Sequence, residues 1–276
     1  GYTHKGIEKL MAGADLGRAI RLAGRTSGDS TVGYAYAFAC AAEAALGLEV
    51  PPRGLWLRAL MAETTKRVVA FRKSLNDRGM KVVFQPVVEL SPRRIEHYEV
   101  LTRFADGKSP IETIEFAERV GLIEELDLLV AERALTFLDK AGPGCNARLA
   151  VNISGRSLQN DAFIAALEKL LRRHGLVRPR ALFEITESTS IHDLTRANRV
   201  IQSFRDAGNS ICLDDFGAGA ASLPYLRAFH VDYIKIDGAY VRRMQDSDRD
   251  LQIMNAIIGM RRQVKTAIVA EMVETQ

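Results

Sequence analysis

The feature that most constrains the fold of this chain is a series of short apolar runs, most of which stop at a polar or charged residue. In the second half of the chain these runs end, in order, at Asn152, Glu184, Asp214, Lys235 and Glu271. They recur about every 30 residues, which is the length of one strand followed by one helix. The stretches between them repeat apolar residues with a helical period, and Gly175 and Gly208 stand where two helices are expected to end. Serial units of this kind predict a (β/α) barrel whose functional side chains meet at the C-terminal ends of the strands.

The stretch from Ser210 to Gly238 shows this pattern most clearly. It contains two apolar runs, a loop broken by glycine and a short helical pattern, which together predict strand, loop, helix and strand. The first run ends in Asp214 and Asp215, two carboxylates that would repel each other in one pocket unless a positive group offset them. A divalent cation that prefers oxygen ligands, Mg²⁺ or Mn²⁺, is such a group. Taken alone, the pair fits a helix cap followed by a solvated acid equally well.

The wider set of strand-end side chains favours a metal site. The set comprises acids, one amide and one lysine: Glu99, Glu184, Asp214, Asp215, Glu271, Asn152 and Lys235. So many like charges on one face are too costly for a structural ion pair. Oxygen ligands from separate strands are typical of two-metal sites, which drive in-line displacement at phosphorus. The spacing therefore predicts chemistry on a phosphate ester, without saying which ester.

Composition limits the classes to which the chain can belong. Its 276 residues, 47% hydrophobic and 26% charged, are ordinary for a globular protein, and a formal charge of +4 does not by itself indicate a nucleic-acid or membrane partner. No apolar run reaches the ~18 residues of a membrane span. The three cysteines are far apart and form no CxxC pair, which argues against disulfides or zinc and favours a reducing compartment, the cytoplasm. Walker-type and GxGxxG motifs are absent, so NTP hydrolysis and dinucleotide redox chemistry are unsupported.

The first 70 residues form a separate, alanine-rich segment that is expected to be helical. A helix is predicted from Thr31 to Leu46, and a second is expected to start near Pro52. At HKGIEKLMAG, RTSGDST and VPPRGLWLRALMAE the segment resembles the large subunit of nickel–iron hydrogenases and the related quinone-site subunit of respiratory complex I. The hydrogenases hold nickel with a CxxC pair where this chain has Ser27 and Ser30, and hydroxyls are poor ligands for such a soft site. The resemblance therefore carries over no metal and no redox activity.

From Phe71 to Gln276 the chain resembles the EAL family of cyclic di-GMP phosphodiesterases. The motifs behind this resemblance are ExLxR at residues 99–103, VNIS around Asn152, EITE from Glu184, DDFGAG from Asp214, KID from Lys235 and AEMVE around Glu271. The fold that it implies is an α/β, TIM-like (β/α)8 barrel with the first strand antiparallel and, in this chain, the last strand missing. The expected domains are a helical segment, 1–70, and a C-terminally truncated EAL barrel, 71–276.

The resemblance also implies roles for individual residues. The metal ligands would be Glu99, Asn152, Glu184, Asp214 and Asp215, holding two Mg²⁺ or Mn²⁺ ions. The catalytic residues would be Glu99, Lys235 at the attacking water and a phosphate oxygen, and Glu271 at the water or second cation. The substrate side would comprise Gln85, Leu101, Arg103 and Glu274, with Glu187 anchoring the loop from Phe216 to Ala221. The expected reaction opens cyclic di-GMP to linear 5′-pGpG, and a homodimer is a further expectation.

Departures from the family pattern leave alternatives open. Met272 replaces a Gly, Ala218 replaces a Thr, and the sequence stops before the family's last strand and helix. The first alternative is a receptor of the same fold that binds cyclic di-GMP without cleaving it, although such receptors typically lose acids that this chain keeps. The second makes the N-terminal segment the working part, as an interaction or electron-transfer accessory, and Ser27 and Ser30 argue against it.

Overall fold

The computed structural model describes most of the chain and divides it into two compact units. The described residues are 7–24, 31–75, 79–107, 109–186, 191–217, 222–243, 247, 251–252, 255, 258–259 and 266–273. The first unit is Gly1–Asn76 and the second is Asp77–Gln276. The acids and the lysine that the sequence singles out all belong to the second unit.

The regular elements described in the first unit are all helices. Its helices are α1 (Ile7–Met11), α2 (Leu16–Gly24), α3 (Thr31–Leu46) and α4 (Pro52–Ser74). The helix expected from Thr31 to Leu46 is present with the same bounds, and α4 starts with Pro52 in its first turn, where a missing N–H costs nothing. Arg58 on α4 pairs with Glu43 on α3. Among the described residues, every helix is too short or too polar to cross a lipid bilayer.

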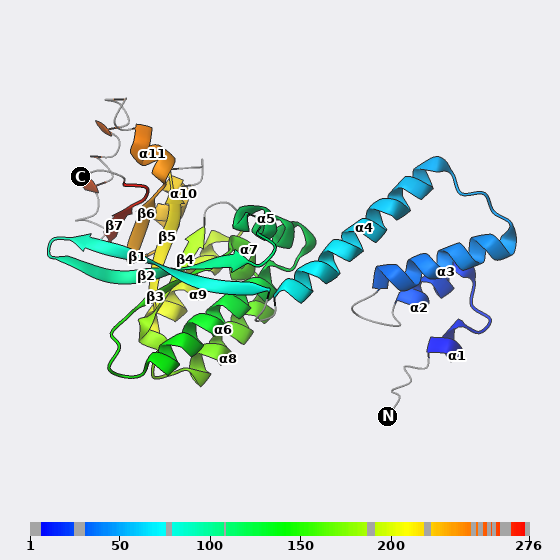
Figure 1. Ribbon diagram of the computed structural model, residues 1–276, viewed down its shortest axis with the longest axis horizontal. Helices are drawn as coiled ribbons and strands as arrows, with labels where there is room; N and C mark the ends of the chain where they lie inside the picture. Colours follow the sequence, from blue (N-terminus) through cyan, green and yellow to red (C-terminus); the bar gives the residue numbers. More distant parts are fainter. Residues whose placement is uncertain are drawn as a thin grey trace. The chain divides into compact units, whose positions relative to one another are not determined.

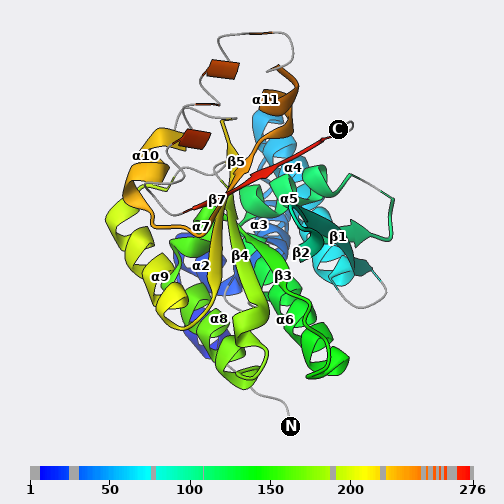
Figure 2. The same cartoon turned by 90° about the vertical axis from the view of Figure 1, so that its left-hand side faces the viewer.

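The second unit is built on a curled sheet of seven strands that forms a half-barrel (Figures 1 and 2). The strands, in chain order and in order across the sheet, are β1 (Met80–Leu90), β2 (Arg93–Phe104), β3 (Leu149–Ile153), β4 (Ala181–Thr186), β5 (Ser210–Phe216), β6 (Tyr233–Ile236) and β7 (Ala267–Ala270). Only β1 runs antiparallel to its neighbour, and every later pair is parallel. The expected TIM-like α/β fold with an antiparallel first strand is therefore confirmed, and the described residues form seven of the eight strands of such a barrel.

Helices follow most strands of this sheet. They are α5 (Pro110–Val120), α6 (Ile123–Ala141), α7 (Gly155–Leu158), α8 (Asp161–Arg173), the short 3₁₀ turn η1 (Arg178–Arg180), α9 (Leu194–Asp206), α10 (Ser222–Ala228) and α11 (Gly238–Arg243). Of these, α6 and α9 pack directly on the sheet. Figure 2 shows α6, α8 and α9 along the sheet. Each long helix buries one apolar stripe, as Phe163, Leu167 and Leu171 do on α8. Side chains cap two of these helices: Asn160 accepts from two N–H groups at the start of α8, and Asp193 accepts from one at the start of α9.

The register of the parallel strands brings their C-terminal ends to one edge. Asn152 lies opposite Glu184, and Thr186 lies opposite Asp214. The register between β5 and β6 shifts between Leu213 and Phe216, which is where the two adjacent aspartates stand. The polar ends of β3, β4 and β5 are thereby held side by side, as the strand pattern in the sequence predicts.

A polar network at the other end of the strands fixes this register. The guanidinium of Arg148, just before β3, donates to Glu96 on β2 at 2.6 Å, to the Tyr233 hydroxyl on β6 at 2.9 Å and to Ser210 on β5 at 2.6 Å. The Tyr233 hydroxyl in turn donates to Glu96 at 2.7 Å. One side chain thus links four strands, and a slip of any of them would leave partly buried charges unpaired.

The stability of this unit should depend on the apolar layer between α8 and its neighbours. Leu167 on α8 is 0% exposed, whereas Leu176, just beyond the helix, is 99% exposed. We expect Leu167→Ala to lower the free energy of unfolding by about 2–5 kcal/mol, because it leaves a cavity in the core. Leu176→Ala is the control and should change it by less than ~0.5 kcal/mol. Urea unfolding measures both, and equal effects would contradict the packing described here.

Candidate functional site

The site is organised around one buried lysine at the end of β6. Lys235 is 4% exposed. Its ammonium group lies 2.9 Å from Glu99 on β2, 3.0 Å from Glu271 after β7, 3.3 Å from Glu184 on β4 and 3.4 Å from Asp214 on β5. Burial alone would lower the pKa of Lys235, but the carboxylates around it, Glu184 foremost, raise the pKa above its ordinary value. The lysine is therefore held in its charged form.

Burial shifts the pKa of two of these carboxyl groups. Burial raises the pKa of Glu184 to about 8 and that of Asp214 to about 7, and the nearby Lys235 only partly opposes this. One oxygen of Glu184, Oε1, is buried and has no hydrogen-bond partner among the described residues. A buried acceptor without a partner is rare in proteins and points to a group that the site takes up.

The side chains form two groups of carboxylates suited to hard cations. Oxygens of Glu99, Glu184 and Asp214 lie within 4.8 Å of one another, and so do oxygens of Asp215, Asp237 and Glu271. Asn152 Nδ2 donates to Glu99 Oε1 at 3.1 Å, which leaves its amide oxygen as the group that it can offer to a cation. Oxygen-only ligand sets of this kind fit Mg²⁺ or Mn²⁺. The donor set and the partnerless Glu184 oxygen together fit the expected metal.

Backbone geometry sends the two adjacent aspartates to different groups. Asp215 has a φ of 56°, a left-handed conformation that is uncommon outside glycine, and its N–H donates to Asp214 Oδ1 at 2.8 Å. Asp214 is buried in the first group, while Asp215 is half-buried in the second. The alternative of a cap followed by a solvated acid does not describe this pair.

One member of the second group was not singled out from the sequence. Asp237 follows Lys235 by two residues, and its Oδ1 accepts from the N–H groups of Ala239 and Tyr240 at 3.0 and 3.1 Å, which caps α11. In the sequence it looks like an ordinary helix cap. Its spacing from Lys235 was the available signal, since alternate residues of a strand lie on the same face.

Three of the four residues predicted for the substrate side lie on the β1–β2 hairpin. Gln85 pairs with Glu99 across the hairpin, and alternation places Leu101 and Arg103 on the same face as Glu99. Gln85 and Arg103 are exposed, and Arg103 donates to the carbonyl oxygen of Thr102 at 2.8 Å. Leu101 and Arg103 thus continue the face of β2 that carries Glu99, on the side of Glu99 toward the end of the strand. Glu187, Glu274 and the loop position Ala218 lie outside the described residues.

Met272 also departs from ordinary backbone geometry. It has a φ of 51° and directly follows Glu271. Its side chain packs on Gly238, where an added Cβ would stand 2.5 Å from the Met272 Cγ. A hydrogen atom at position 238 and the bulk of Met272 are thus matched to each other beside the second group of acids.

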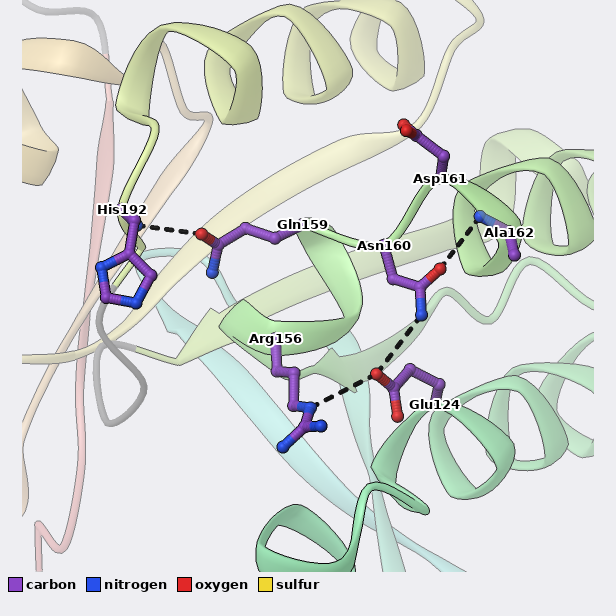
Figure 3. A pocket seen from close by; sticks show the side chains of 7 residues that line it. All are labelled: Glu124, Arg156, Gln159, Asn160, Asp161, Ala162 and His192. Carbon is purple, nitrogen blue, oxygen red and sulfur yellow. Dashed lines mark hydrogen bonds and ion pairs between the residues drawn. The ribbon is translucent and has the colours of Figure 1, made fainter. Parts of the chain in front are cut away.

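A hollow of about 700 Å³ lies apart from these acids (Figure 3). It is lined by Glu124, Arg156, Gln159, Asn160, Asp161, Ala162 and His192. The lining carries charges of both signs, and Arg156 pairs with Glu124 at 3.5 Å. None of the lining residues belongs to either group of acids, so the chemistry is located by the carboxylates and not by this hollow.

The raised carboxyl pKa values make the stability of the metal-free protein dependent on pH. Folded Glu184 and Asp214 keep protons that the unfolded chain has released, so the free energy of unfolding should fall as pH rises from about 6.5 to 8. Asp127, whose pKa burial raises to about 7, acts in the same direction. His97, whose pKa burial lowers to about 4, has made its full contribution to the free energy of unfolding above about pH 6.5, and Lys235 stays charged throughout. Urea unfolding in a metal chelator measures this slope.

Two variants test the origin of that slope. Glu184→Gln removes one titrating group and should make stability fall less steeply across the same pH range. Glu89→Gln removes an exposed carboxylate that pairs with Arg94 and should leave the slope unchanged. A wild-type protein whose stability rose with pH over this interval would contradict the assigned protonation.

The match between Gly238 and Met272 predicts a rescue. We expect Gly238→Ala to lower the free energy of unfolding by about 1–3 kcal/mol, because the new methyl group overlaps the Met272 side chain. Adding Met272→Gly should restore most of the loss, since it removes both the overlap and a left-handed non-glycine residue. Chemical unfolding of the single and double variants gives the coupling energy, and additive effects would rule out the contact.

Comparisons with known proteins agree with this fold and these motifs. Residues 68–276 match the family model described as the EAL domain. Cyclic di-GMP phosphodiesterase NbdA of Pseudomonas aeruginosa is 31% identical over 211 residues, 74% of this chain and 27% of the relative. Cyclic di-GMP phosphodiesterase PdeB of Shewanella oneidensis is 31% identical over 222 residues, 76% of this chain and 25% of the relative. The chain thus spans about a quarter of the length of these curated relatives.

A solved structure extends the likeness to three dimensions. The PaMucR phosphodiesterase in complex with c-di-GMP superposes with a TM-score of 0.68 at 28% identity, covering 76% of this chain and 88% of that one. None of the comparisons supports the expected resemblance of residues 1–70 to the hydrogenase large subunit, and the family match begins at residue 68. Over the second unit the sequence match, the half-barrel and the strand-end acids agree, and the chain belongs to the EAL domain family.

Proposed function

We propose that residues 71–276 form a phosphodiesterase domain that hydrolyses cyclic di-GMP to linear 5′-pGpG with two divalent cations, Mg²⁺ or Mn²⁺. The observation behind the proposal is the convergence of carboxylates from separate strands on Lys235, in two groups of oxygens. Relatives named cyclic di-GMP phosphodiesterases and the c-di-GMP complex of a structural neighbour support the choice of substrate. Residues 1–70 are proposed to be a separate helical segment.

The first cation is proposed to bind Glu99, Asn152, Glu184 and Asp214, and the second to bind Asp215 with help from Glu271 and Asp237. The partnerless Glu184 oxygen supports the first assignment, since it has an unused lone pair in a buried place. When bound, such cations lower the pKa of water and offset the negative charge of a phosphate. Burial, and after it the neighbouring carboxylates, raises the pKa of Asp214 and Asp215, and bound cations would favour the charged form of both groups.

Lys235 and Glu271 are proposed to act on the reacting atoms. The raised pKa of Lys235 keeps its ammonium charged, so it can donate to a phosphate oxygen and stabilise the charge that grows there in the transition state. Glu271 lies 3.0 Å from that ammonium and is less buried than Glu184, so it can accept the proton of the attacking water. The oxygen of the attacking water bonds to phosphorus as the P–O bond to one ribose 3′ oxygen breaks, that oxygen takes up a proton from solvent, and the ring opens.

The hairpin is proposed to seat the substrate. Arg103, an exposed guanidinium on the Glu99 face of β2, is suited to a second phosphate oxygen. Gln85 and Leu101 lie on the same face and would contact the nucleotide, with Glu274 assigned to the same task. Glu187 is proposed to anchor the loop after Phe216. Action in the cytoplasm and as a homodimer completes the proposal, and the free thiols of Cys40, Cys145 and Cys212 are compatible with a reducing compartment.

The test is the product formed from cyclic di-GMP by wild type and by Glu99→Gln with Mn²⁺. Loss of a residue that only orients a metal ligand costs ~10–100-fold, so loss of a ligand should cost about 100-fold or more in kcat/KM. Glu89→Gln on the same hairpin, where Glu89 pairs with Arg94, is the control and should keep wild-type turnover. Chromatography separates the linear from the cyclic dinucleotide. No linear product from folded, Mn²⁺-loaded wild type would remove the enzyme and leave a receptor.

A further inference from the structure

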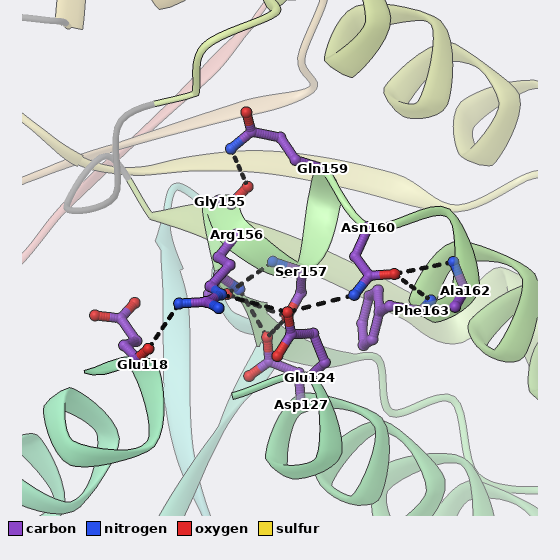
Figure 4. Close-up of polar contacts among 11 residues, drawn as sticks. Glu118, Glu124, Asp127, Gly155, Arg156, Ser157, Gln159, Asn160, Ala162 and Phe163 are labelled. Carbon is purple, nitrogen blue, oxygen red and sulfur yellow. Dashed lines mark hydrogen bonds and ion pairs between the residues drawn. The ribbon is translucent and has the colours of Figure 1, made fainter. Parts of the chain in front are cut away.

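A buried carboxylate outside the two acid groups holds the backbone that follows β3 (Figure 4). Asp127 on α6 is 7% exposed. Its Oδ2 accepts from the backbone N–H of Ser154 at 2.9 Å and from the hydroxyl of Ser157 at 2.7 Å. α6 itself is fixed against the sheet and its neighbours by buried apolar residues, among them Leu126 and Val130 on either side of the aspartate. The anchor is therefore a rigid one.

The two serines close the cluster on themselves. Ser154 Oγ accepts from the Ser157 N–H at 3.0 Å, which caps α7, and the two hydroxyl oxygens lie 3.1 Å apart. Ser157 is 0% exposed, so its polar atoms find their partners within the cluster. Moving the turn away from Asp127 would leave several buried polar groups unpaired. Because these hydrogen bonds are directional and buried, they hold the turn in a single conformation.

This turn is two residues from a proposed metal ligand. Ile153, buried as the last residue of β3, separates Ser154 from Asn152. Asn152 reaches the opposite way, into the acid site, where its amide nitrogen donates to Glu99. Asp127 therefore fixes the turn after β3 from one side, while Asn152 at the end of β3 points to the acids on the other side.

The residue that follows α7 also bonds to the segment between β4 and α9. Gln159, just after α7, accepts from the backbone N–H of His192 at 2.9 Å and donates to the carbonyl oxygen of Gly155 at 2.9 Å. Residue 192 belongs to the segment between β4, which carries Glu184, and α9. The element anchored on Asp127 thus follows the strand that supplies Asn152 and also bonds to a residue that lies between β4 and α9.

We propose that Asp127 is a positioning residue for the first cation: it holds the β3–α7 turn so that Asn152 presents its amide oxygen beside Glu99. The proposal rests on the proposed function for the identity of the site, but it concerns metal binding and not turnover. The role is one of shape. A neutral acceptor of the same size should serve, because both donors bond to a single oxygen of Asp127.

The test compares Mn²⁺ affinity, measured by electron paramagnetic resonance of free Mn²⁺, for wild type, Asp127→Asn and Asp127→Ala. Removal of residues that orient metal ligands typically weakens binding ~10–100-fold, so we expect at least ~10-fold for Asp127→Ala. Asp127→Asn keeps an oxygen acceptor and should stay within ~3-fold of wild type. Asp127→Ala that is folded by thermal unfolding and binds Mn²⁺ like wild type would overturn the proposal.

A matched control separates positioning from general loss of stability. Asp232, before β6, accepts from the Ile211 N–H at 2.9 Å and pairs with Arg205 at 2.8 Å, so it too anchors a strand, at the opposite end of the sheet. Asp232→Ala should lower the unfolding temperature without changing Mn²⁺ affinity. Equal weakening of Mn²⁺ binding by Asp232→Ala and Asp127→Ala would also overturn the proposal.

A milder variant decides the matter if Asp127→Ala does not fold. Ser157→Ala removes one of the two donors and should weaken Mn²⁺ binding while leaving the anchor to Ser154 in place, and unchanged affinity would count against the positioning role. Turnover of cyclic di-GMP by wild type is measured in parallel. Wild type that binds Mn²⁺ but makes no linear product would remove the proposed function, while the affinities still decide the role of Asp127.

Discussion

The rest of this structure depends on one ammonium group that is surrounded by carboxylates. Lys235 reaches Glu99, Glu184, Asp214 and Glu271, and a single positive charge cannot neutralise them all. Burial, with the neighbouring acids adding to it, raises the pKa of Glu184 and Asp214, and one Glu184 oxygen has no hydrogen-bond partner among the described residues. Burying like charges is costly unless something offsets them, so the resting site is poised to gain free energy from added cations.

The half-barrel makes this crowding possible because the residues that stabilise the sheet and the crowded acids lie at opposite ends of the strands. At one end, Arg148 ties four strands through Glu96, Ser210 and Tyr233, and every one of those polar atoms has a partner. At the other end the same strands terminate in groups that repel one another. Unfavourable backbone conformations occur there as well, at Asp215 and Met272. Strain of this kind persists only where the surrounding structure fixes it, and it is concentrated at functional sites.

Sequence alone was enough to predict which strands end in polar or charged side chains, because a strand end is visible as an apolar run that stops at such a residue. It predicted the order of the strands for the same reason, and Asn152, Glu184 and Asp214 do lie side by side. Asp127 could not be found in this way, because an acid inside an amphipathic helix reads as a solvated residue until tertiary packing buries it. The part that Met272 plays was also hidden, since its contact with Gly238 depends on two turns brought together by the sheet.

A polar anchor at the end of β3 makes physical sense where an apolar one would not. Apolar contacts stabilise in proportion to buried area and tolerate sliding, whereas a hydrogen bond weakens steeply as its geometry departs from the ideal. Metal sites need ligands held to within ~0.5 Å, which favours the directional bond. The Ser154 N–H is bonded to Asp127 two residues beyond Asn152, so a displacement of the turn would also displace the side chain that we propose as a ligand. The same reasoning explains why the lysine, and not a hydrophobic residue, fills the middle of the site: its bonds to the carboxylates fix their separation.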